Sequence, residues 1–104
     1  MAGDPENGGV KVEDFYAEKA LGGKGFFQRI TFPPGCCSEE TTYTHPYIVY
    51  PLTGGTLSIE IGGGKVEQER LEIGTVYVRH ASPEKPIRVR VCNHTDYPII
   101  ILKG

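Results

Sequence analysis

The sequence predicts an all-β domain of about eight or nine short antiparallel strands, arranged as a closed barrel or as a sandwich. Fourteen glycines and eight prolines interrupt the 104 residues at short intervals, which favours many turns. Between the turns, apolar and polar residues alternate with the two-residue period of a strand, most clearly at Leu57, Ile59 and Ile61. No long stretch has the spacing of an amphipathic helix. The pattern by itself does not choose between a barrel and a sandwich.

The first half of the chain contains three predicted strand regions. Residues 10–21 fit either a short helix or a strand, because the run VKV begins like a strand while the later apolar residues have helical spacing. Residues 26–32 are rich in β-forming residues and end at the turn Pro33-Pro34-Gly35. Residues 41–52 are predicted to form one long strand that closes at Thr53-Gly54-Gly55.

The second half has the same layout of short strands and turns. The three glycines of residues 62–64 predict a hairpin connection. Residues 65–73 are polar with few apolar anchors, which fits an outer or edge strand. Pro83 and Pro86 mark residues 80–86 as a loop, since neither proline can donate to a strand ladder. The remaining predicted strands are residues 56–61, 75–79, 87–92 and 99–102.

The stretch between Gly35 and Gly55 is the centre of the functional prediction. Thr41, Tyr43, His45, Tyr47 and Val49 fall on one parity of the predicted strand 41–52. Successive side chains of a strand point to opposite faces, so these five are expected to share one face. In an all-β domain that face looks into the core or a cavity. Hydroxyls, phenols and an imidazole there would line a polar pocket.

The composition limits the classes of partner. A formal net charge of −2 gives no electrostatic reason to expect nucleic acid or an anionic membrane as a partner. No apolar run approaches the roughly 20 residues of a membrane-spanning helix. The acidic, glycine-rich residues 1–9 are expected to form a flexible arm outside the fold. Residues 10–104 are then a single domain with one core.

The cysteines number three, an odd count, and predict no disulfide framework. Cys36 and Cys37 are adjacent and can hardly bridge to each other in ordinary geometry. The third cysteine is Cys92. A reducing, cytoplasmic compartment is therefore the expected location.

The glycine framework resembles the cupin superfamily, whose small members are single-domain jelly rolls of the RmlC-like, double-stranded β-helix type. The stretch PPG…THPY…PLTGG is similar to the PPG…HRHPY…PLTGG of small cupins, and Gly74 opens the second cupin motif. Asn93-His-Thr-Asp-Tyr-Pro resembles the turn that often ends the domain. The resemblance covers roughly residues 26–103. The positions that keep the spacing of the first cupin motif are Gly35, Thr41, Tyr43, Tyr47 and Gly54.

The resemblance implies a metal site, but the matching residues depart from it. Cupins hold a metal with three His and one carboxylate. The matching positions are Thr41, Tyr43, Tyr47 and, counted without gaps, Lys85. None of these is a good ligand for Fe, Mn, Ni or Zn, which bind imidazole and carboxylate. We therefore expect no cofactor.

A second alignment, shifted by two residues, leaves one ligand. It makes His45 the second motif histidine and puts Tyr43 in place of the first. An atypical divalent site built from His45, His80 and Glu39 or Glu40 stays open as an alternative.

The candidate ligand-binding residues are Thr41, Tyr43, His45, Tyr47, His80 and Lys85. His45 is either an acid–base catalyst, because its ordinary pKa near ~6.5 suits proton transfer, or a buried histidine that only fills space. Tyr43 and Tyr47 either orient a ligand or pack in the core. His80 would lie at the barrel mouth, and Lys85 would be a pocket cation that attracts a carboxylate.

Three functions follow from these candidates. The first is a barrel that binds a small polar or carboxylated molecule without the usual cupin metal. The second is an enzyme, either a cofactor-free isomerase, lyase or cyclase that uses His45 and Tyr43, or a metal-dependent oxygenase or isomerase with an unusual ligand set. The third is a structural protein whose dimer surface does the work. The resemblance also implies a homodimer, with residues 10–21 lying across the partner.

Overall fold

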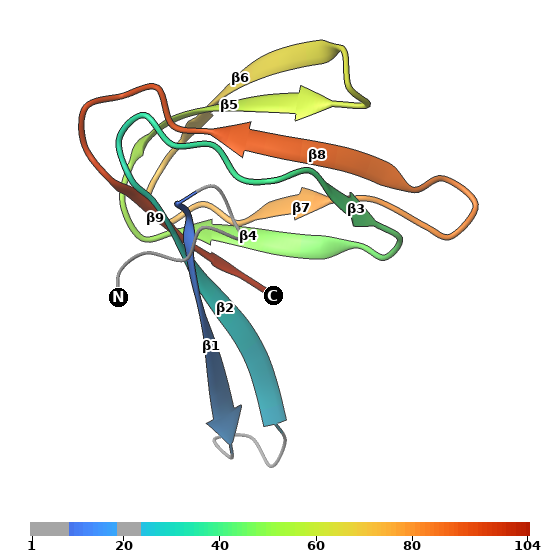
Figure 1. Ribbon diagram of the computed structural model, residues 1–104. Helices are drawn as coiled ribbons and strands as arrows, with labels where there is room; N and C mark the ends of the chain where they lie inside the picture. Colours follow the sequence, from blue (N-terminus) through green and yellow to red (C-terminus); the bar gives the residue numbers. More distant parts are fainter. Residues whose placement is uncertain (1–8, 19–23) are drawn as a thin grey trace.

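In the computed structural model, the described residues form nine β-strands in two antiparallel sheets that pack face to face (Figure 1). The structure describes the backbone of residues 9–18 and 24–104 and the side chains of residues 9–14 and 27–104. No helix capable of crossing a membrane occurs in these ranges. The predicted all-β class is therefore confirmed, and the two-sheet arrangement is that of a jelly roll.

The larger sheet has five strands and the smaller has four. The larger sheet has the order β1-β2-β9-β4-β7, with β1 Lys11–Glu18, β2 Lys24–Phe32, β9 Ile99–Lys103, β4 Tyr47–Pro51 and β7 Tyr77–Arg79. The smaller sheet has the order β3-β8-β5-β6, with β3 Thr41–Tyr43, β8 Ile87–Cys92, β5 Gly55–Ile61 and β6 Lys65–Leu71. Segments distant in sequence thus become neighbours: β9 lies between β2 and β4.

The core lies between the two sheets and comes from the inward positions of alternating strands. Its buried cluster consists of Val10, Phe32, Val49, Leu57, Leu71, Ile99 and Ile101. Val10 is only 1% exposed, so the packed domain begins at or before this residue. The segment 10–21, which fits a helix or a strand by sequence, contains the strand β1 as far as Glu18. The predicted flexible arm, residues 1–9, lies almost wholly outside the described residues.

The stretch predicted as one strand over 41–52 is two strands in different sheets. β3 ends at Tyr43 and pairs with β8, whereas β4 begins at Tyr47 and pairs with β7 and β9. Residues 44–46 form a bend between them. Pro46 lacks a backbone N–H and cannot donate to a ladder at this point, which is consistent with the interruption.

A disulfide joins Cys37 to Cys92, so the expectation that the cysteines form no disulfide is wrong. Residues 35–38 run beside the end of β8: the N–H of Gly35 donates to the carbonyl of Asn93 at 2.8 Å, and the N–H of Asn93 donates to the carbonyl of Cys36 at 2.9 Å. This pairing aligns Cys37 with Cys92 and leaves Cys36 as a free thiol. The argument for a reducing, cytoplasmic compartment loses its basis.

Candidate functional site

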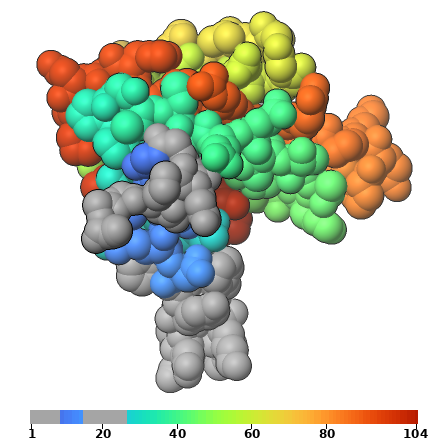
Figure 2. Space-filling view, viewed as in Figure 1, coloured from blue at the N-terminus to red at the C-terminus, as the bar shows by residue number. Residues whose placement is uncertain are grey.

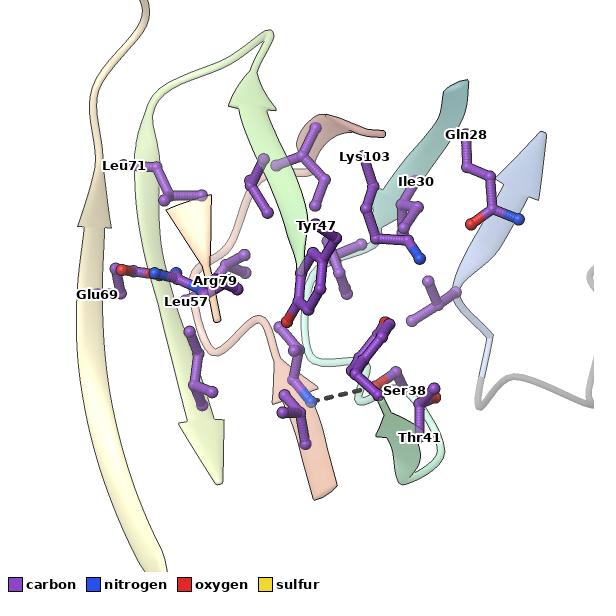
Figure 3. A pocket seen from close by; sticks show the side chains of 18 of the residues that line it. Gln28, Ile30, Ser38, Thr41, Tyr47, Leu57, Glu69, Leu71, Arg79 and Lys103 are labelled. Atoms are coloured by element: carbon purple, nitrogen blue, oxygen red, sulfur yellow. Dashed lines mark hydrogen bonds and ion pairs between the residues drawn. The ribbon is translucent and has the colours of Figure 1, made fainter. Parts of the chain in front are cut away.

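The two sheets enclose a cavity of about 360 Å³, which is within the usual range for small-molecule sites (Figure 3). Its apolar walls come from inward-facing residues such as Ile30, Val49 and Leu57. Polar side chains enter it from several strands. Those with hydrogen-bonding or charged groups are Gln28, Ser38, Thr41, Tyr43, Tyr47, Glu67, Glu69, Arg79 and Lys103.

Tyr43 and Tyr47 form an aromatic pair at the cavity wall. Their ring centroids are 4.2 Å apart and the rings are tilted by 31°. One ring comes from β3 and the other from β4, so the pair spans the two sheets next to the bend at residues 44–46. Burial raises the pKa of Tyr43. Burial, with a smaller contribution from Tyr43, raises the pKa of Tyr47 to about 12, against the opposing effect of nearby Arg79. Both phenols therefore keep their protons at neutral pH.

Lys103 places an ammonium group against these two rings. Its Nζ atom lies 4.8 Å from the Tyr43 centroid and 5.4 Å from the Tyr47 centroid, within the range of cation–π contacts. Burial lowers the pKa of Lys103, because it disfavours the charged form. Among the residues whose side chains are described, no carboxylate lies within ion-pair distance of Lys103.

The position of Lys103 is fixed by the sheet. It lies on β9, opposite Gln28 of β2 and Val49 of β4. The following residue, Gly104, exchanges two backbone hydrogen bonds of 3.0 Å with Ile48, so the ladder continues past Lys103. Ile99, Ile101 and Lys103 share one parity of β9 and face inward. The amine is therefore held at the cavity by a backbone that is paired on both sides.

The other charged groups of the cavity have partners. Arg79 of β7 forms an ion pair with Glu69 of β6, and the two side chains are 25% and 24% exposed. The carboxylate of Glu67 lies 3.2 Å from the Nζ atom of Lys65. Figure 3 shows Arg79 and Glu69 on one side of Tyr47 and Lys103 on the other. Lys103 is thus the cavity charge for which the described residues supply no ionic partner.

Solved structures show which fold this is, while no family model and no curated protein matches the sequence. A cupin domain from Bordetella pertussis is similar with a TM-score of 0.68 and 20% identity, covering 88% of each chain. A Cupin 2 conserved barrel domain protein from Salinispora arenicola is similar with a TM-score of 0.65 and 15% identity, covering 94% of this chain and 76% of the other. The protein has the cupin fold. The resemblance stated from the glycine framework is thereby confirmed at the level of fold.

A third similar structure is a predicted oxalate decarboxylase from Thermotoga maritima, with a TM-score of 0.59 and 16% identity, covering 90% of this chain and 76% of the other. Cupin folds support many chemistries, so function has to be argued from the side chains of this cavity.

Three of the predicted site residues line the cupin cavity. Thr41, Tyr43 and Tyr47 all contribute to its wall, as the parity of the 41–52 stretch predicted. Whether they contact a ligand stays a prediction.

The predicted inward position of His45 is wrong. Its side chain is exposed in the bend between β3 and β4, where Nδ1 lies 3.1 Å from the hydroxyl of Thr44. The prediction extended strand alternation through residues 44–46, but these residues leave the ladder and the alternation does not apply to them. An acid–base role for His45 inside the cavity has no geometric support.

His80 and Lys85 also lie away from the cavity lining. Both are exposed in the 80–86 loop, which protrudes at one edge of the molecule (Figure 2). The backbone N–H of Lys85 donates to the carbonyl and the hydroxyl of Ser82, each at 3.0 Å, within a local turn. The prediction that Lys85 is a pocket cation is wrong, because the gap-free motif count falls on an exposed residue of this loop that does not line the cavity.

The side chains in the cavity do not fit the metal site that the cupin resemblance implies. The matching positions hold two phenols, a hydroxyl and a loop lysine, whose donor chemistry suits none of Fe, Mn, Ni or Zn. Within the described ranges, no three His, Cys, Asp or Glu side chains gather closely enough to hold an ion. The alternative set of His45, His80 and Glu39 or Glu40 does not come together. A cavity without a cofactor stays a prediction.

Proposed function

We propose that this cupin barrel binds a small carboxylated molecule in its central cavity, with Lys103 as the charge that attracts it. The observation that carries the proposal is the half-buried ammonium group of Lys103, for which no described residue supplies a carboxylate. A buried charge is costly unless it is paired and hydrogen-bonded. A ligand carboxylate would supply the pairing that the side chains described here do not.

The tyrosines support the same class of ligand. The hydroxyls of Tyr43 and Tyr47 are protonated at neutral pH, because the ordinary tyrosine pKa is 10.0 and burial raises it further, so they can donate to a carboxylate oxygen. Their rings and the apolar wall suit a short hydrocarbon portion. Charge-assisted hydrogen bonds to the ammonium and to the phenols would then orient the ligand in the cavity.

The experiment is a calorimetric titration with acetate, butyrate and benzoate, each paired with its neutral amide. We expect the acids to bind and the amides to bind more weakly. Lys103→Met should weaken acid binding by about tenfold or more, since hydrogen bonds to charged groups contribute about 1.5–3 kcal/mol. Lys103→Arg keeps the charge and should retain part of the affinity.

Lys85→Met is the matched control, because it removes one lysine charge from an exposed loop. It should leave binding unchanged. Equal binding of acids and amides would contradict the proposal. The proposal would also be contradicted if Lys85→Met lost binding and Lys103→Met did not. Lys85, the residue predicted from the sequence, would then be the cation that attracts the ligand.

A further inference from the structure

The amine of Lys103 differs from the other lysines whose side chains are described. Lys11 and Lys65 are 67% and 74% exposed, and each lies near a glutamate, at 3.7 Å from Glu13 and 3.2 Å from Glu67. Lys85 is exposed in a loop. Lys103 faces a cavity with space for a small molecule beside it. It combines access to a ligand with partial removal from water.

The surroundings of Lys103 favour a reactive amine. Two phenol rings face it from β3 and β4, and Gln28 lies opposite it on β2. Across the cavity, Glu67 and Glu69 on β6 and Arg79 on β7 are engaged in their own ion pairs. Burial lowers the pKa of Lys103, so a larger fraction of the amine is neutral than in an exposed lysine. Lysines that react with carbonyl compounds are activated by such desolvation.

We infer that Lys103 forms a reversible imine with a small 2-oxo acid bound in the cavity, an inference that rests on the proposed carboxylate binding. The Lys103 ammonium first releases a proton to solvent; the neutral amine then donates its electron pair to the carbonyl carbon, and the carbonyl oxygen takes up a proton from solvent. The resulting carbinolamine loses its hydroxyl group as water, which leaves a protonated imine. Atoms and charge balance with no oxidant or reductant. The step requires the neutral amine as nucleophile.

A 2-oxo acid fits this site better than a simple aldehyde or ketone. Its carboxylate is attracted by the protonated form of Lys103 before the reaction. After condensation the protonated imine nitrogen keeps its positive charge two bonds from that carboxylate, so the charges stay paired. The phenols of Tyr43 and Tyr47 retain their protons at neutral pH and can hydrogen-bond the carbonyl oxygen or the carboxylate.

The test is reductive trapping with pyruvate and sodium cyanoborohydride, followed by peptide mapping by mass spectrometry. We expect the reduced adduct on Lys103, with little on Lys11, Lys65 or Lys85, which serve as internal references. Lactate, which has no carbonyl, should give no adduct. Labelling of Lys103 only to the same extent as Lys11, Lys65 and Lys85 would overturn the inference, because it would show ordinary surface reactivity.

Lys103→Arg separates this inference from the proposed function. It keeps a cation but has no amine that can form the imine, so it should lose trapping while still binding lactate. Direct titration of the wild-type protein with pyruvate and lactate completes the test, with folding of each protein checked by its amide NMR spectrum. If both acids bind and pyruvate is never trapped on Lys103, the imine is refuted and carboxylate binding stands. If neither acid binds and nothing is trapped, both proposals fail for this class of ligand.

Discussion

The Nζ atom of Lys103 lies 4.8 Å from the centroid of the Tyr43 ring, across the space where the two sheets face each other. The two residues come from different sheets and are distant in the sequence. Two opposing effects act on this amine: the ring stabilises its charged form, while burial disfavours it. Burial lowers the pKa of Lys103, and the contact with the ring acts in the opposite direction.

Removing the ring of Tyr43 should lower the pKa of Lys103 further. A cation–π contact contributes about 0.5–1 kcal/mol, so Tyr43→Leu should lower this pKa by about half a unit. Tyr43→Phe keeps the ring and should change it less. The measurement is an NMR titration of the Lys103 Cε–Hε signals. A pKa that stays the same in both variants would contradict a role for the ring.

Tyr47 should make the protein lose stability at alkaline pH. Its folded pKa is raised to about 12 from an ordinary value of 10.0, so the unfolded state releases this proton first as pH rises. The stabilising contribution is therefore fully present below pH 10.0 and is lost as pH rises toward about 12. Urea denaturation at several pH values checks this. Tyr47→Phe should lose less stability than wild type over this window; identical pH profiles would argue against the raised pKa.

The disulfide between Cys37 and Cys92 should contribute substantially to stability. It closes a loop with a sequence separation of 55, for which chain entropy gives about 4 kcal/mol. We expect reduction, or the double change Cys37→Ala and Cys92→Ala, to lower the free energy of unfolding by an amount of this order. Cys36→Ser removes the free thiol and is the matched control. Equal unfolding curves with and without reductant would show that the bond does not form.

The homodimer stays a prediction, and the sheet edge gives it a physical basis. β1 is an outermost strand, and the part of β2 before Gln28 extends past the end of its ladder with β9, so β1 and β2 continue as a two-stranded ribbon (Figure 1). Such ribbons are marginal alone and exposed edges favour pairing with another chain. Light scattering at micromolar concentration should give the dimer mass. A monomer mass throughout a dilution series would refute it.

The sequence contained enough to predict the fold but only part of the cavity. Turn residues and two-residue alternation located most strands, and the inward positions of Thr41, Tyr43 and Tyr47 followed from parity. Parity is reliable only within a continuous strand, which is why it failed for His45 in the bend.

The charged residues of the cavity could not be found in the same way. Lys103 follows a run of apolar residues near the end of the described chain, where a lysine usually marks the change to solvent. The available signal was strand alternation, which puts the side chains of Ile99, Ile101 and Lys103 on one face. Only the pairing of β9 with β2 and β4 shows that this face looks into a cavity. The pair of Arg79 and Glu69 joins strands from different sheets, and no local pattern reports such a contact. Cys92 likewise meets Cys37 only through tertiary pairing.

The most direct test of the central claim is the pKa of Lys103, measured by NMR with and without saturating acetate. A bound carboxylate favours the charged amine, so we predict that acetate raises the pKa of Lys103 and that acetamide does not change it. If acetate leaves the Lys103 titration unchanged, or acetamide shifts it as much as acetate does, the cavity does not hold carboxylates through Lys103.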